Sequence, residues 1–115
     1  MKKILYIEDS IMDYVIFRRL INKTFPDCIV YWITTISCGE EFISHSGEKL
    51  DMVISDLTGV SLNPNIMAAI DSLNHDNVVL TSSYCMPVST KYKFVLKTDW
   101  PAFIKGLANP PPPNA

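Results

Sequence analysis

The chain has 115 residues, 48% of them apolar, which is enough for one compact domain with a buried core. No apolar stretch approaches the roughly 20 residues of a membrane-spanning helix, and the net charge of -2 gives no reason to expect attraction to the phosphate backbone of nucleic acids. We therefore expect a soluble, cytoplasmic domain with no membrane insertion and no direct nucleic-acid binding.

Apolar runs alternate with segments of helical periodicity from the N-terminus onward. Residues 3–8 predict a strand, and Ser10 predicts the N-cap of a helix that runs to about Thr24. The apolar stripe expected to face the core from this helix comprises Ile11, Val15, Ile16, Leu20 and Ile21. Residues 28–34 are β-branched and aromatic, which favours a second strand.

The same alternation continues to residue 108. Ser37 predicts the N-cap of the second helix. The elements predicted from there on are helix 38–44, strand 51–55, helix 64–73, strand 77–82, strand 92–97 and a last helix that ends before Asn109. Strands that alternate with helices over short connections indicate a parallel sheet with both faces covered.

Two segments depart from this alternation. About eleven residues separate Ser82 from Phe94. A crossover with its helix needs at least about 10–12 residues, so this connection has the minimum length. Because Pro87 in the middle opposes a helix, we predict a shortened or missing fourth helix. The proline run near the C-terminus predicts an extended, disordered tail at 109–115, which leaves a single domain at 1–108.

Polar residues stand at the ends of four predicted strands. In parallel sheets, ligands bind at the carboxyl ends of the strands, where these residues would meet: Glu8 and Asp9, Asp56, Thr81, and Lys97. Taken singly, each has an ordinary explanation as a helix cap, a turn former, a strand residue or a solvated lysine. Together they supply carboxylates, a hydroxyl and an ammonium, the groups needed to place a phosphoryl group on an aspartate beside a divalent metal.

This order of motifs resembles the receiver domain of two-component response regulators, in particular the chemotaxis-regulator type, over residues 3–108. The motifs are ILYIEDS at 4–10, VISDL at 53–57, VVLTS at 78–82 and FVLK at 94–97. The resemblance implies a doubly wound α/β fold with a five-stranded parallel sheet of flavodoxin-like order 2-1-3-4-5.

The resemblance also implies a phosphoacceptor and a metal site. Asp56 matches the position of the aspartate that accepts the phosphoryl group. Asp9, Asp56 and the backbone carbonyl of Thr58 would bind Mg²⁺ directly and Glu8 would bind it through water, since Mg²⁺ prefers hard oxygen ligands and keeps several waters. Phosphoryl transfer needs positioning and charge neutralisation more than acid–base help, and these groups would provide both.

Further positions are implied to bind the transferred group and to report its presence. Lys97 would give its ammonium to one phosphoryl oxygen, while the Thr81 hydroxyl and the backbone N–H of Ser82 would donate to others. Thr81 and Phe94 would form the switch, because in relatives the threonine moves inward and the aromatic residue rotates into the vacated space. Phosphorylation would then shift an existing equilibrium between two arrangements.

Three departures from the usual receiver pattern are visible. Thr98 follows Lys97 at a position where relatives usually carry a proline with a cis peptide bond. A cis peptide bond before a residue other than proline costs about 3–4 kcal/mol, so we expect a rearranged loop or a local interaction that offsets this cost. The segment after Asp56 lacks the usual Met-Pro turn. The shortened connection also removes part of the face that receivers use to meet partners, and its apolar residues are a candidate replacement surface: Tyr84, Met86 and Val88.

Two functional hypotheses stay open. In the first, a histidine kinase or a phosphotransfer protein phosphorylates Asp56 in the presence of Mg²⁺, which changes the binding of an unknown downstream protein; such a domain is no enzyme beyond its own phosphorylation and dephosphorylation. In the second, the chain is a non-switching pseudo-receiver, a protein–protein interaction module. An aspartyl-phosphate hydrolase or pump is disfavoured, because the chain is short and Thr58 occupies the place of a second catalytic aspartate.

Overall fold

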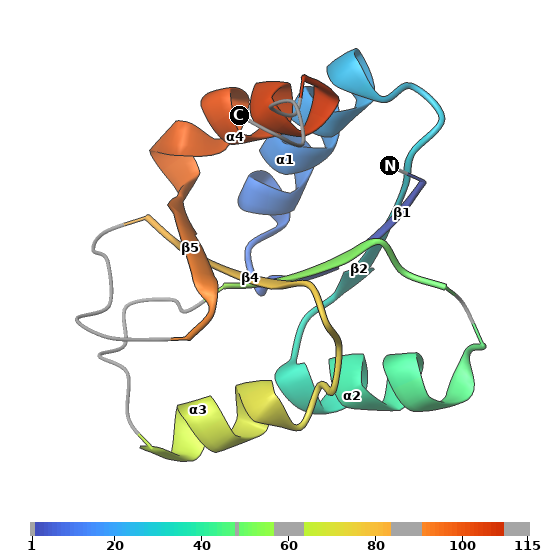
Figure 1. The fold of residues 1–115 in the computed structure, drawn as a ribbon, viewed down its shortest axis with the longest axis vertical. Helices are drawn as coiled ribbons and strands as arrows, with labels where there is room; N and C mark the ends of the chain where they lie inside the picture. Colours follow the sequence, from blue (N-terminus) through green and yellow to red (C-terminus); the bar gives the residue numbers. More distant parts are fainter. Residues whose placement is uncertain (1, 48, 57–63, 84–90, 110–115) are drawn as a thin grey trace, which may run out of the picture.

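The computed structural model describes residues 2–47, 49–56, 64–83 and 91–109 (Figure 1). The strands are β1 (Lys3–Ile7), β2 (Ile29–Ile33), β3 (Met52–Asp56), β4 (Val78–Ser82) and β5 (Lys93–Leu96). The helices are α1 (Ile11–Thr24), α2 (Ile36–His45), α3 (Pro64–Asp71), the 3₁₀ turn η1 (Lys97–Asp99) and α4 (Trp100–Ala108).

The five strands form one parallel sheet in the order β2-β1-β3-β4-β5. Helices α1 and α4 cover one face, and α2 and α3 cover the other (Figure 1). We call these the α1/α4 face and the α2/α3 face. The doubly wound fold and the strand order predicted from the sequence are confirmed, so the carboxyl ends of all five strands meet at one edge of the sheet.

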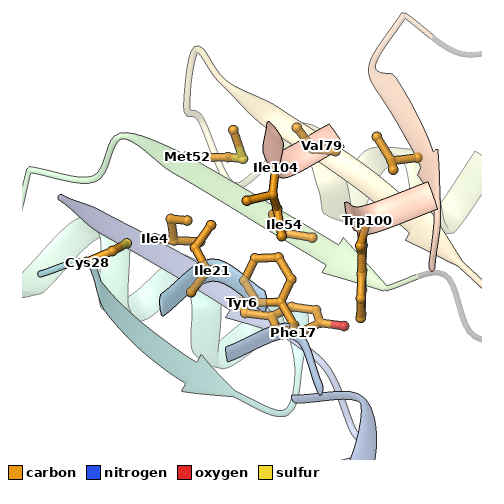
Figure 2. Close-up of a cluster of buried hydrophobic side chains, with 11 residues drawn as sticks. Ile4, Tyr6, Phe17, Ile21, Cys28, Met52, Ile54, Val79, Trp100 and Ile104 are labelled. Atoms are coloured by element: carbon orange, nitrogen blue, oxygen red, sulfur yellow. The ribbon is translucent and has the colours of Figure 1, made fainter. Parts of the chain in front are cut away.

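The α1/α4 face is filled by a mixed aromatic and aliphatic cluster (Figure 2). Tyr6 of β1, Phe17 of α1 and Trp100 of α4 pack edge to face, with ring centroids 4.8–5.7 Å apart, a favoured geometry for aromatic rings. The α2/α3 face is filled by a mainly aliphatic cluster that includes Leu5, Ile70 and Leu73. Successive residues of β1 alternate between the two clusters, as the strand period of two requires.

Helix α1 begins where the sequence predicts, because the Ser10 side chain accepts a hydrogen bond from the backbone N–H of Asp13 at 3.3 Å. Its predicted inward stripe is wrong in part. Ile11 and Ile16 are 60% and 46% exposed, whereas Phe17 and Ile21 are buried. The rings of β1 and α4 select the Phe17 side of the helix, and the spare apolar residues face outward.

Helix α2 begins two residues earlier than predicted, because Thr35 instead of Ser37 provides the N-cap and accepts from the Cys38 N–H at 3.1 Å. Gly39 lies in its first half. A methyl group built there would lie 2.6 Å from Cδ1 of Ile7, so the absence of a side chain lets α2 approach β1 closely.

The connection between β4 and β5 is described only at residues 83, 91 and 92. The predicted shortening of the fourth helix and the candidate surface of Tyr84, Met86 and Val88 therefore fall outside the described residues. The same holds for residues 110–115 of the predicted tail. In the described part of the chain, no peptide bond is cis, and Lys97–Asp99 form a 3₁₀ turn after β5. Within the same ranges, no helix has the length and apolar character needed to cross a membrane.

Candidate phosphoacceptor and metal site

The strand-end residues predicted from the sequence meet on the α1/α4 side of the sheet edge. Glu8 follows β1, Asp56 ends β3 and pairs in register with Thr81 of β4, and Lys97 follows β5. Two-residue alternation places Glu8 on the same face as Tyr6, and Asp56 on the same face as Ile54. The parallel sheet thus gathers groups that lie up to 89 positions apart in sequence.

Lys97 is the centre of this arrangement. Its Nζ donates to Glu8 Oε2 at 2.9 Å and to Asp13 Oδ2 at 2.6 Å, and it forms an ion pair with Asp56 Oδ1 at 3.0 Å. The side chains of Glu8 and Asp56 are only 1% and 3% exposed, and that of Lys97 is 9% exposed. Buried charges of this kind require close partners, and here each carboxylate has the ammonium beside it.

Glu8 is held from several sides. Besides Lys97, the Tyr6 hydroxyl donates to its Oε2 at 3.0 Å, and the Ser10 N–H donates to its Oε1 at 3.1 Å. Burial raises the pKa of Glu8, the Lys97 hydrogen bond opposes this increase, and the nearby negative charge of Asp56 adds to it. The carboxylate is therefore fixed in place but poorly compensated, which favours an additional positive charge at this position.

The pKa values of Lys97 and Tyr6, the two side chains that donate to Glu8, are both raised. Burial alone would lower the pKa of Lys97, but its hydrogen bonds to Asp13 and Glu8 and its contact with Asp56 outweigh burial and raise the pKa above the usual range. Burial and the adjacent Glu8 charge likewise raise the pKa of Tyr6. Lys97 is therefore a permanent cation and Tyr6 a permanent hydroxyl donor at ordinary pH.

Glu8, Asp9 and Asp56 form a set of carboxylates suited to a hard divalent cation. Each offers one oxygen, and the three oxygens lie within 4.8 Å of one another. Oxygens bound to one Mg²⁺ at about 2.0–2.1 Å are separated by at most about 4 Å, so a small contraction would bring them to the ion. Asp9 is exposed and can make that adjustment. The donor set fits Mg²⁺. The other predicted ligand, the Thr58 carbonyl, lies outside the described residues.

The predicted phosphate-binding and switch residues are placed as follows. Thr81 is fully buried, and its hydroxyl has no hydrogen-bond partner among the described residues, although a buried hydroxyl normally has one. Ser82 ends β4 and is 4% exposed. Phe94 is half-buried and packs with the cluster on the α2/α3 face. Their roles in binding phosphate and in switching stay predictions.

Sequence reasoning did not find three residues of this site. Asp13 binds Lys97 from α1, and Tyr6 binds Glu8 from within β1. Trp32 of β2 donates its indole N–H to the Glu8 carbonyl oxygen at 2.7 Å and stacks on the Tyr14 ring. Only Tyr6 carried a usable signal, because residues two apart in a strand share a face.

Solved structures show which known fold has this sheet and this edge. A response regulator from Hahella chejuensis matches with a TM-score of 0.66 and 18% identity, over 95% of this chain and 93% of that chain. The N-terminal domain of a response regulator/sensory box/GGDEF three-domain protein from Carboxydothermus hydrogenoformans matches with a TM-score of 0.65 and 22% identity, over 93% of each chain. The chain has the receiver fold.

A third receiver supports the same assignment. The response regulator receiver protein from Sinorhizobium medicae matches with a TM-score of 0.63 and 13% identity, over 95% of each chain. No protein-family model matches the sequence, and a search of curated proteins finds no match. Because all three identities are low, the likeness establishes the fold alone. The chemistry has to be argued from the residues of this chain at the carboxyl edge of the sheet.

Proposed function

We propose that the chain is a phosphoacceptor receiver domain, which takes a phosphoryl group onto Asp56 from a phosphohistidine of a histidine kinase or phosphotransfer protein. The observation that carries this proposal is the contact of Lys97 Nζ with both Asp56 and Glu8, in a site where three carboxylates suit a divalent cation. Such a site combines a nucleophile with charge neutralisation, which is what phosphoryl transfer requires.

The transfer forms one bond and breaks one. A carboxylate oxygen of Asp56 bonds to phosphorus while the phosphorus–nitrogen bond of the donor breaks, and the electron pair of that bond returns to the imidazole. Lys97, whose Nζ lies 3.0 Å from Asp56 Oδ1, would offset the charge on the phosphoryl oxygens. The buried Thr81 hydroxyl, which lacks a partner among the described residues, supplies a donor for another oxygen. Mg²⁺ held by Glu8, Asp9 and Asp56 would neutralise the developing negative charge when bound.

A switching output follows from the same site. The phosphoryl group adds negative charge and three acceptor oxygens at the sheet edge. If Lys97 and Thr81 turn toward these oxygens, the Lys97 contacts with Glu8 and with Asp13 in the first turn of α1 change, and Thr81 of β4 gains a partner. The proposed consequence is a shift between two arrangements of this edge, read by a downstream protein.

The test is exposure of the full chain to a small phosphodonor with Mg²⁺, followed by intact-mass measurement. We expect a phosphoryl adduct on the wild type, none on Asp56→Asn, and an unchanged adduct on Asp51→Asn, because Asp51 lies at the opposite end of β3. The adduct should also disappear when a chelator replaces Mg²⁺. Absence of an adduct on the wild type would contradict the proposal.

The pseudo-receiver alternative also has an observation in its favour. The Lys97 ammonium already contacts three carboxylates, so the side chains of this site are held in place without a phosphoryl group. A domain of this kind would keep the fold and bind a partner without modification. The phosphodonor experiment separates the two functions, since an unmodified wild type that is folded is the result expected for a pseudo-receiver.

A further inference from the structure

Asp13 occupies a position where an acidic residue ordinarily serves to stabilise the start of a helix. It lies in the first turn of α1, where acidic residues are commonly stabilised by the partial positive charge of the helix N-terminus. The capping contact, however, uses only its backbone N–H, which donates to Ser10 Oγ. The side-chain carboxylate instead accepts a hydrogen bond at Oδ2 from Lys97 Nζ at 2.6 Å, across 84 positions of sequence.

Lys97 Nζ donates hydrogen bonds to Glu8 and Asp13 and forms an ion pair with Asp56. A lysine ammonium has three N–H donors, and three carboxylate oxygens lie within 3.0 Å of its nitrogen, from Glu8, Asp13 and Asp56. Two of its three N–H groups are thus held by Glu8 and Asp13, and Lys97 can give more of them to phosphoryl oxygens on Asp56 when one of these hydrogen bonds is released or shared.

Asp13 is the partner that is easiest to release. Its side chain is 31% exposed, compared with 1% for Glu8 and 3% for Asp56. Water can therefore solvate the Asp13 carboxylate as it turns away, whereas a buried carboxylate left without a partner would cost far more. Glu8 is in addition held by Tyr6 and by the Ser10 N–H.

Asp13 also opposes the arriving group by its charge. It touches the same ammonium as Asp56, so the two carboxylates are close neighbours, and the phosphoryl group would bring more negative charge to that place. Asp13 is not among the three carboxylates that suit the divalent cation. Its charge would therefore not be used directly in metal binding when phosphate arrives.

We infer that Asp13 is a positioning residue that holds Lys97 in the unphosphorylated protein and competes with the phosphoryl group for its ammonium, so that it slows phosphorylation of Asp56. This inference rests on the proposed phosphoacceptor function. Removing the charge of Asp13 frees Lys97 and reduces the repulsion, and both effects favour transfer. Since Asp13 is partly exposed, we expect a gain of about two- to tenfold in rate, in keeping with a solvent-screened ion pair.

The experiment compares initial rates of adduct formation on the full chain with acetyl phosphate at saturating Mg²⁺, for the wild type, Asp13→Asn and Asp27→Asn. Asp27→Asn makes the same change in net charge beyond the far end of α1, which is about 20 Å long for its 14 residues, and it should leave the rate unchanged. Asp13→Asn should react faster. A merely structural role would not increase the rate, because a damaged site loses activity.

Ionic strength provides the second readout. The advantage of Asp13→Asn should shrink between about 0.05 and 1 M salt, because salt screens partly exposed charges. Thermal unfolding followed by circular dichroism checks the fold of each variant, and Asp13→Ser, which also removes the charge, replaces Asp13→Asn if the latter is unfolded.

The outcomes distinguish a failure of the inference about Asp13 from a failure of the proposed phosphoacceptor function. A wild type that forms an adduct, with an Asp13→Asn rate equal to or below its own, overturns the inference and leaves the proposed function standing. A folded wild type that forms no adduct overturns the proposed function and the inference with it. A faster Asp13→Asn beside an unchanged Asp27→Asn supports the inference.

Discussion

The two faces of the sheet are built from different kinds of residue. The α2/α3 face is mainly aliphatic, with Leu5, Leu73 and Leu80 almost wholly buried. The α1/α4 face combines the rings of Tyr6, Phe17 and Trp100 with a cluster of charges at its carboxyl edge. Buried ion clusters are weak contributors to stability, so the first face serves mainly to hold the sheet together and the second to position reactive groups.

The Tyr6 side chain connects the aromatic core of the α1/α4 face to the charged edge. Its ring packs in the aromatic cluster of the α1/α4 face, and its hydroxyl binds Glu8. The charged edge is therefore anchored to the core through an aromatic residue. This comparison predicts that changes on the charged edge alter both stability and cation binding, whereas changes on the aliphatic face alter stability alone.

The largest expected effect comes from Lys97→Met, which keeps a long side chain and removes the ammonium. Because Glu8 and Asp56 would remain buried without their counter-charge, we expect a loss of about 3–5 kcal/mol in the free energy of unfolding. Mg²⁺ should restore part of this loss, since it brings positive charge to the same carboxylates. Urea unfolding with a chelator and with Mg²⁺ measures both quantities.

The matched control for this change is Lys105→Met on the exposed side of α4. It should shift the free energy of unfolding by no more than about 0.5 kcal/mol. A Lys97→Met protein as stable as the wild type would show that the ion cluster is not compensated by this lysine.

On the other face, Leu73→Ala should cost about 2–5 kcal/mol of unfolding free energy, because Leu73 is 1% exposed and its loss leaves a cavity in the aliphatic cluster. Mg²⁺ affinity should stay that of the wild type, as followed by the fluorescence of Trp100, whose ring lies 6.0 Å from Lys97 Nζ. A tenfold weaker Mg²⁺ affinity in the folded variant would mean that the faces are not separable.

Tyr6→Phe tests the link between core and charged edge. It keeps the ring and removes the donor to Glu8 Oε2, which should cost about 1.5–3 kcal/mol, the range for hydrogen bonds to charged groups. Tyr31→Phe on the α2/α3 face, whose ring packs 4.9 Å from Phe42, is the control and should change stability by about 0.5 kcal/mol or less. If chemical denaturation gives the same change in unfolding free energy for Tyr6→Phe and Tyr31→Phe, the Tyr6 hydroxyl does not anchor the charged edge.

The smallest effect is expected at the opposite end of the sheet. The N–H groups of Lys3 and Lys2 donate to Asp51 and lower its pKa below the usual value of 3.8. A carboxyl group with a lowered pKa in the folded state stabilises the protein above its unfolded pKa, and this contribution is lost as pH falls. Asp51→Asn should therefore be slightly less stable than the wild type at pH 7, and the two should converge near pH 2.

The measurement for Asp51 is thermal unfolding of both proteins across this pH range. The gap between the two should be small, because Asp51 is exposed and its interactions are screened by solvent. A gap that widens toward low pH would have the wrong sign for a lowered pKa.

The sequence was sufficient for the parts of the site that follow from strand order. Glu8, Asp56, Thr81 and Lys97 each lie in the last two positions of a strand or directly after one, and the parallel arrangement alone brings strand ends together. The fold was predictable for the same reason, since alternating strands and helices admit few topologies.

The parts that depend on helix orientation could not be predicted. Asp13 reaches Lys97 only because α1 packs against α4 with its Phe17 side inward, and apolar residues around α1, such as Ile11 and Ile16, offered another inward side. The cap of α2 was missed because Thr35 and Ser37 can both serve as an N-cap, and serine is the more favoured of the two residue types. In both cases tertiary packing chose between local options of similar quality.

Calorimetric titration of Mg²⁺ into the full chain is the most direct test of whether carboxylates from separate strands assemble one cation site. We expect a single site in the wild type, loss or strong weakening of binding in Asp56→Asn, and unchanged binding in Asp51→Asn at the other end of β3. A folded wild type that binds no Mg²⁺, or an Asp56→Asn variant that binds it equally well, would show that these carboxylates do not form one cation site.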